Sequence, residues 1–234
     1  MNIEVLLSTM HQKDMSIIDK MNIQGDAIII NQCDSYGYIE KNGTRHIKMY
    51  SFNEKGIGKS RNNALMRSTA DICLMADDDM VYVDGYEDIV AGAFESNPKA
   101  DMIVFNVKIH NKDGSSFKVK ANERVRWFNC LKYGTVTFAF RRKKIIKNNI
   151  YFSSLFGGAK YGSGEDSIFI WDCLRHGMKI YSDTTKIADV YNYESTWFNG
   201  YDEKYFINRG ALFAAISKTM AHILILQFLL RKRS

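Results

Sequence analysis

Short apolar runs that alternate with helical patterns constrain the fold of this chain more than any other feature. The runs have the length and composition of β-strands, and helical stretches separate them. They comprise residues 3–8, 27–31, 47–50 and 72–76. Strands separated by helices need crossover connections, so we expect an α/β fold in which helices sandwich a mostly parallel sheet.

Composition limits the class of protein and its partners. The 234 residues are 46% hydrophobic and include one Pro, which allows a single substantial core. The 32 Lys and Arg exceed the 26 Asp and Glu by six, so nucleotide phosphates, acidic lipids and nucleic acid are candidate partners. Four widely spaced Cys predict core thiols in a reducing compartment rather than a zinc site. The first ten residues resemble a buried strand and not a cleavable signal, so we expect a cytoplasmic protein.

Three consecutive carboxylates, Asp77, Asp78 and Asp79, end the fourth apolar run. If the strand continues through them, Asp77 and Asp79 point to one face and Asp78 to the other. Two carboxylates about 4 Å apart repel by roughly 4 kcal/mol at an effective dielectric near 20, and a divalent cation between them removes this cost. Magnesium or manganese suits such a site, because substrate phosphates and water complete its coordination. An acidic turn that caps the next helix is the alternative.

Other polar residues follow the same edge of the expected sheet, where ligands bind at the carboxyl ends of parallel strands. They are Thr9, Gln32 and Asp34. Between the third and fourth strands, a glycine-containing turn at residues 55–58 leads to a helix start with Ser60 as its N-cap. Backbone N–H groups at such a start can hold phosphate, and Arg61 adds charge-assisted bonds. An ordinary helix with one exposed Arg explains the same residues.

The second half of the chain has less regular patterns. Residues 102–109 and 116–120 flank Asp113-Gly114, which predicts a β-hairpin, and residues 135–140 predict a further strand. The basic run at residues 141–144 is interpreted as a solvated helix start.

A further helix is expected at residues 167–176, where apolar side chains recur at helical spacing before Gly177. Glu165 and Asp166 lie at its N-terminus, directly after Gly164. The helix dipole favours their ionised forms there. They therefore either compensate the dipole or include a catalytic base.

These motifs together resemble family 2 glycosyltransferases of the GT-A (Rossmann-like) fold. The resemblance rests on the Arg61-Asn62 helix, the aspartate triplet and Gly164-Glu165-Asp166, and it extends over residues 3–193. It implies an inverting enzyme that moves a sugar from a nucleotide-diphosphate sugar, with a UDP-sugar as the expected donor. The acceptor would be the hydroxyl group of a glycan or a lipid-linked molecule, as in the assembly of bacterial surface polysaccharides.

The resemblance also assigns roles by position. Asp166 matches the general base, and Glu165 would orient the acceptor. The donor would bind at Thr9, Gln32, Asp34, Arg61, Asp77 and Asp78. Asp77 and Asp79 match the D-x-D motif that holds Mn²⁺ or Mg²⁺. Many relatives add a histidine after the last core strand, where this chain has none, so either Asn192 or Asp189 is the third ligand or the third ligand is lost.

The resemblance also divides the chain. Residues 1–195 form the transferase domain, with a nucleotide-sugar half at 1–105 and an acceptor half at 106–195. Residues 196–234 form a helical tail, whose apolar stretch 211–230 precedes three basic residues. Twenty helical residues span about 30 Å, but Lys218 and His222 interrupt the stretch, so we expect it to lie on an anionic membrane, at the inner face of the cell membrane. Packing on its own domain or in a homodimer is the alternative.

Two other functions remain as alternatives at the level of the sequence. A nucleotidyltransferase would also hold phosphates with acidic residues and metal, but it would not need Gly164-Glu165-Asp166. A basic nucleic-acid-binding module would fit the charge of +6 and the aromatic second half. That module leaves the three aspartates unexplained, so no nucleic acid is expected as a partner.

Overall fold

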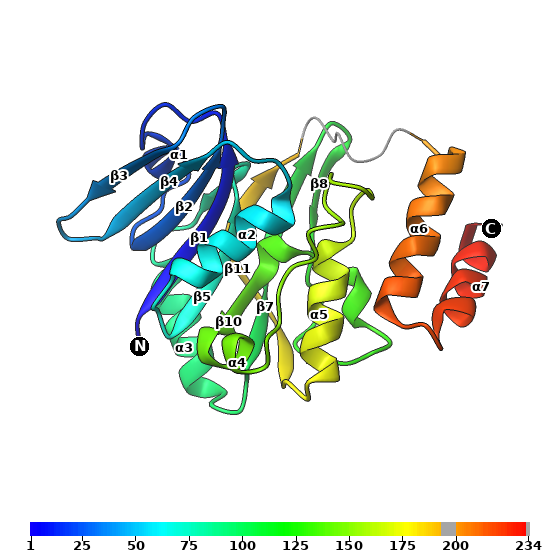
Figure 1. Ribbon diagram of the computed structural model, residues 1–234. Coiled ribbons are helices and arrows are strands. Elements are labelled where there is room, and N and C mark those ends of the chain that lie inside the picture. Colours follow the sequence, from blue (N-terminus) through cyan, green and yellow to red (C-terminus); the bar gives the residue numbers. More distant parts are fainter. Residues whose placement is uncertain (193–199, 233–234) are drawn as a thin grey trace.

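The structure, a computed structural model, describes residues 1–192 and 200–232. Its strands are β1 (Ile3–Met10), β2 (Asp26–Gln32), β3 (Gly37–Lys41), β4 (Ile47–Phe52), β5 (Ile72–Asp77), β6 (Met80–Tyr82), β7 (Met102–Asn111), β8 (Gly114–Phe117), β9 (Arg124–Val125), β10 (Phe138–Arg141) and β11 (Ile180–Tyr191). Its α-helices are α1 (Ile17–Lys20), α2 (Ile57–Arg67), α3 (Tyr86–Ser96), α4 (Arg142–Lys147), α5 (Glu165–Arg175), α6 (Glu203–Ile216) and α7 (Ala221–Lys232). One central sheet carries helices on both faces, as the sequence predicts (Figure 1).

The sheet is mixed, with a regular parallel part. Its strand order is β3-β4-β2-β1-β5-β10-β7-β11-β6, with β8 beside β7 and β9 beside β11. The four strands predicted in the first hundred residues are confirmed as β1, β2, β4 and β5, and they run parallel to one another. β10 lies antiparallel between β5 and β7, so the parallel arrangement does not continue across the sheet.

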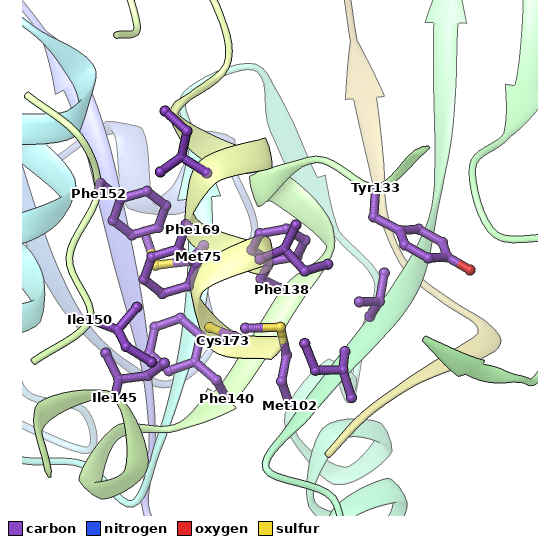
Figure 2. Close-up of a cluster of buried hydrophobic side chains, with 14 of the residues drawn as sticks. Met75, Met102, Tyr133, Phe138, Phe140, Ile145, Ile150, Phe152, Phe169 and Cys173 are labelled. Atoms are coloured by element: carbon purple, nitrogen blue, oxygen red, sulfur yellow. The ribbon is translucent and has the colours of Figure 1, made fainter. Parts of the chain in front are cut away.

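Apolar side chains fill two cores, one on each face of the sheet, because successive strand residues point to opposite faces. In β5, Cys73 and Met75 face α2 and α5, whereas Ile72 and Leu74 face α1 and α3. Figure 2 shows the first core, in which α5 carries Phe169 against strand and loop residues. The rings of Phe169 and Phe152 stack with centroids 4.0 Å apart. This packing fixes α5 against the sheet and thereby positions its N-terminus.

Several predicted boundaries are wrong. α2 begins at Ile57 and not after Ser60, because Gly56 ends the preceding turn with a φ of 117° and replaces a side-chain cap. Residues Thr135–Thr137 form a 3-10 turn, so the strand predicted there is confined to Phe138–Arg141. The predicted hairpin is present as β7 and β8, although β8 ends at Phe117.

The apolar tail forms two helices in place of the single helix expected over residues 211–230. α6 ends at Ile216, and α7 begins at Ala221 after a short turn. α6 packs against α5, and α7 packs against α6, so the pair stands at one side of the sheet (Figure 1). None of the helices in residues 1–192 and 200–232 has the length and apolar character that a membrane span requires.

Candidate active site

The three aspartates do not continue the strand. β5 ends at Asp77, and Asp78 and Asp79 form the turn into β6, so the alternation expected for these side chains is wrong. Asp78 accepts a hydrogen bond of 2.6 Å from the hydroxyl of Thr9 at the end of β1. The turn therefore lies at the carboxyl edge of the parallel strands, where ligands bind in folds of this class.

Arg61 is the central cation of the site. Its side chain is only 4% exposed on α2, and its Nη2 donates to both carboxylate oxygens of Asp77 at 2.9 Å. Its Nη1 donates to Oε1 of Glu165 at 2.7 Å. Burial works to lower the pKa of Arg61, but the charges of Asp77 and Glu165 outweigh it and raise that pKa. The guanidinium thus stays charged and joins β5 to the start of α5.

This position differs from the one expected for Arg61 from the sequence. The sequence predicts an exposed Arg or a phosphate ligand, whereas the guanidinium forms ion pairs with the carboxylates of Asp77 and Glu165. Truncating one member of such a buried pair leaves an uncompensated charge, which typically costs about 3–5 kcal/mol. Arg61 therefore positions the carboxylates around it.

The start of α5 brings two carboxylates to the same region. Glu165 is buried, and its second oxygen accepts a hydrogen bond of 3.1 Å from the N–H of Gly164. Gly164 has a φ of 141°, and a Cβ there would lie 2.8 Å from Leu212 of α6, so only glycine fits. Because Glu165 points to Arg61, the geometry favours positioning over the acceptor contact expected for it.

Asp166 has the environment of a base. Burial, followed by the charge of Glu165, raises the pKa of Asp166 to about 6, while the charge of Arg61 opposes this rise. Its Oδ1 accepts a hydrogen bond of 2.7 Å from the N–H of Ser167, and its Oδ2 lies close to Gly134. A carboxylate with this pKa is mostly ionised at neutral pH and holds a proton more strongly than an ordinary Asp.

Asp79 is the carboxylate best placed to meet a cation. Asp79 is exposed at the turn, yet neighbouring protein atoms remove part of its hydration. This desolvation and the charges of Asp77 and Asp78 raise the pKa of Asp79 to about 6. No basic side chain in the described part of the chain pairs with it. A divalent cation would relieve this repulsion.

The donor atoms present fit a loosely held hard cation and not a closed protein cage. Within residues 1–192 and 200–232, no three His, Cys, Asp or Glu side chains converge as metal ligands. Both oxygens of Asp77 already accept from Arg61, which leaves Asp79 as the open carboxylate. Mg²⁺ and Mn²⁺ commonly bind through one or two carboxylates and complete their coordination with phosphate and water.

The candidate third ligands lie on the neighbouring strand end. The N–H of Tyr191 donates to the backbone oxygen of Asp79 at 2.9 Å, so Asn192 follows directly beside the aspartate turn. Asp189 is engaged elsewhere, since its two oxygens contact His110 at 2.8 Å and Lys186 at 2.7 Å. Of the two, Asn192 remains the better candidate.

The predicted donor residues gather only in part. Thr9 and Gln32 are buried at the ends of β1 and β2, and Gln32 donates to the backbone oxygen of Gly56 at 3.2 Å. Gln12 donates to the hydroxyl of Thr9, which extends the contact with the aspartate turn. Asp34 is exposed beyond β2, and no hydrogen bond or ion pair in the described residues joins it to the others.

Two positioning features were not found in the sequence. The amide of Asn62 makes reciprocal hydrogen bonds of 2.8 Å with the backbone of Phe152, which ties α2 to the loop before α5. Gly58 allows the same close approach, because a Cβ there would lie 2.2 Å from the backbone oxygen of Ser153. The pair Arg61-Asn62 is visible in the sequence, but Phe152, the partner of Asn62, lies 90 residues away and is not indicated by any local pattern.

Solved structures provide an independent comparison. Residues 1–349 of S. aureus TarS in complex with UDP-GlcNAc superpose on 98% of this chain and 72% of that chain, with a TM-score of 0.71 and 15% identity. The same region in complex with UDP gives a TM-score of 0.69. A longer TarS chain gives 0.65, with 43% of it covered. No protein-family model and no curated protein sequence matches.

The chain has a GT-A-like fold. TarS is a glycosyltransferase, and the likeness covers nearly the whole chain, including both parts of the candidate site. At 15% identity the likeness establishes the fold alone, so the activity has to be argued from the side chains.

Proposed function

We propose that this protein is an inverting glycosyltransferase of family 2, which transfers a sugar from a nucleoside-diphosphate sugar to a hydroxyl group of a glycan or lipid-linked acceptor in polysaccharide synthesis. The observation that carries the proposal is the Arg61 bridge, which joins the aspartate turn to the start of α5. It brings a candidate cation site and a candidate base to one edge of the sheet. The UDP and UDP-GlcNAc complexes of TarS support a uridine diphosphate donor.

The proposed chemistry divides between the two ends of the site. An inverting transfer is an in-line displacement at the anomeric carbon, so the acceptor hydroxyl must lose its proton as it attacks. Asp166 would take this proton at its free oxygen, and its raised pKa suits the task. Arg61 and Glu165 would hold the start of α5 in place while Thr9 and Asp78 shape the donor side.

The departing diphosphate requires charge stabilisation at the other end. Mn²⁺ or Mg²⁺, held by Asp79 with Asn192 and a lesser share from Asp77, would neutralise that charge when bound. Asp79 is the key residue in this assignment because it is exposed and no side chain neutralises it within the described residues.

A thermal-shift panel of UDP-, GDP- and TDP-sugars, with and without Mn²⁺, tests the proposal. A ligand at 100 times its Kd stabilises the folded protein by about 2.7 kcal/mol, which is readily measured. We expect UDP-sugars to raise the Tm, and Mn²⁺ to increase the shift. Free sugars and UMP are the matched controls.

Two outcomes would contradict the proposal. If no nucleoside-diphosphate sugar raises the Tm under either condition, the site is not a donor site. If nucleoside triphosphates bind instead and pyrophosphate is released in the presence of a sugar phosphate, the protein is a nucleotidyltransferase.

A further inference from the structure

The helical hairpin formed by α6 and α7 has an apolar surface that no other part of residues 1–192 and 200–232 covers. In α7, Leu224 and Phe228 face α6, where Phe228 contacts Phe213 at a centroid distance of 6.0 Å. On the opposite side, Ile223, Leu226 and Leu230 are 58–60% exposed. Their spacing of three and four residues places them on a single face, which we call the outer face of α7. α7 is therefore apolar on two sides but packs on one.

A helix that is apolar all round is normally buried on all sides. Each large aliphatic side chain gains about 1.5–3 kcal/mol on full burial, so three exposed ones on one face indicate a second partner. α7 lies at the outer edge of the molecule, farthest from the sheet (Figure 1). That partner must approach from outside.

The distribution of charge identifies the chemistry of the partner. Six of the 32 Lys and Arg, and none of the 26 Asp and Glu, lie in residues 204–234. Asp202 and Glu203 directly precede this segment, so the whole tail, residues 196–234, carries +4 of the net +6, and the preceding 195 residues carry the other +2. Lys218 is exposed in the turn between the two helices, and Lys204 is exposed at the opposite end of α6. A second copy of this face would bring like charges together, whereas an anionic lipid surface would neutralise them.

The same hairpin contacts the start of α5. Leu212 of α6 lies against Gly164, and Asn208 of α6 lies close to Gly162. These glycines directly precede Glu165 and Asp166. A surface bound by the hairpin would thus lie on the side of the molecule where α5 begins.

We propose that the α6–α7 hairpin docks on an anionic lipid bilayer through the outer face of α7 and its flanking cations, and so holds the Asp166 end of the site near the membrane. Apolar side chains between cationic ends suit a helix that lies in the interface. The inference rests on the hairpin surface and does not require the transferase activity. It would nevertheless favour a lipid-linked acceptor over a soluble one.

Flotation with vesicles of phosphatidylcholine and phosphatidylglycerol tests the docking, with pure phosphatidylcholine vesicles as the control. The full chain should float with the anionic vesicles and be released by high salt. Replacing the outer face by Ile223→Gln, Leu226→Gln and Leu230→Gln preserves the charge and should weaken binding at least about tenfold. Ile39→Gln, at an exposed position of β3, should have no effect.

A second pair of variants isolates the charges. Lys204→Gln with Lys218→Gln should weaken binding several-fold, whereas Lys99→Gln with Lys147→Gln removes the same charge elsewhere and should change it less. Circular dichroism and the thermal shift with UDP-sugars check that each variant is folded. A retained donor shift with lost flotation separates this proposal from that of the function.

Amide hydrogen exchange of the vesicle-bound protein measures which side of the protein faces the membrane. Amides of α6, α7 and residues 162–164 should gain protection, while β3 should not. Absence of flotation, or equal losses in the hairpin and control variants, would overturn the proposal. A dimer by light scattering that the outer-face variants dissociate, without vesicle binding, would assign the surface to a second copy of the chain.

Discussion

The carboxylates of the candidate site differ in whether a cation neutralises them. Asp77 and Glu165 share the guanidinium of Arg61 at 2.7–2.9 Å. Within residues 1–192 and 200–232, neither Asp79 nor Asp166 has a cationic side chain bonded to it, and the pKa of each is raised to about 6 by desolvation and neighbouring negative charge. Asp77 and Glu165, through their shared bonds to Arg61, thus hold β5 and α5 together. The other pair holds a proton more strongly than ordinary carboxylates do, and it is the pair for which we propose the metal-binding and catalytic roles.

The largest effect is expected at Asp166. Asp166→Asn removes the proton acceptor and should lower the rate of sugar transfer by about 10²–10⁴-fold, while the Kd of the donor stays the same. Single-turnover kinetics and calorimetry measure the two quantities. Asp113→Asn, in the exposed turn between β7 and β8, is the matched control. A parallel loss of donor affinity would instead indicate that Asp166 supports the structure of the α5 start.

The neutralised pair should affect stability more than chemistry. Arg61→Met keeps the length of the side chain but leaves Asp77 and Glu165 without their cation, so the free energy of unfolding should fall by about 3–5 kcal/mol. Urea denaturation measures this loss, and Lys59→Met on the exposed side of α2 is the control.

Removing the charges of Asp77 and Glu165 provides a second test of whether the Arg61 bridge stabilises the fold. Adding Asp77→Asn and Glu165→Gln to Arg61→Met should recover part of the lost stability, because the uncompensated charges disappear. If the triple variant is no more stable than Arg61→Met, the bridge does not account for the loss.

Asp79 should affect the metal and leave the fold unchanged. Asp79→Asn should reduce the Mn²⁺-dependent part of donor affinity by about 10–100-fold, because the amide is a weaker ligand for a hard cation. Calorimetry with and without Mn²⁺ separates this part from metal-independent binding. An unchanged Mn²⁺ dependence would remove Asp79 from the metal site.

The last comparison concerns the pH dependence of stability. The folded-state pKa of Asp166 is raised from 3.8 to about 6, so the folded protein binds this proton more tightly than the unfolded chain. The contribution of Asp166 to stability therefore falls as the pH rises from about 4 to about 6. The free energy of unfolding of Asp166→Asn should rise relative to that of the original protein by up to about 3 kcal/mol across this window, and the gain should level off above it.

Urea titrations at a series of pH values measure this difference, with Asp34→Asn as an exposed control. The rate of transfer by the original protein should decrease below about pH 6, because protonated Asp166 cannot accept a proton. A difference in stability that does not vary between pH 4 and 7 would show that Asp166 is not the group that titrates.

The sequence was sufficient for the parts of the fold that depend on local pattern. The strands β1, β2, β4 and β5 follow from short apolar runs, and α5 follows from its helical spacing. The break between α6 and α7 was missed although Lys218 interrupts the apolar stretch, because this interruption was interpreted as a polar position within one helix and not as the end of α6.

The arrangement of the site was less accessible from the sequence. Arg61 and Glu165 are 104 residues apart, so their contact depends on tertiary structure that no local pattern specifies. The raised pKa values of Asp79 and Asp166 likewise depend on desolvation, which the fold creates. The residue types were therefore identifiable in advance, whereas the division of the carboxylates into a neutralised pair and a pair with raised pKa values was not.

The concentration of positive charge in residues 204–234 has a consequence for how the molecule moves. The tail, residues 196–234, carries +4 of the net +6 at one side of the molecule, so the charge distribution is asymmetric and the field of an anionic surface exerts a torque on it. At physiological ionic strength this field extends about 8 Å, so rotation would take place during the last part of the approach. The protein would then arrive hairpin first, already oriented before any side chain touches lipid.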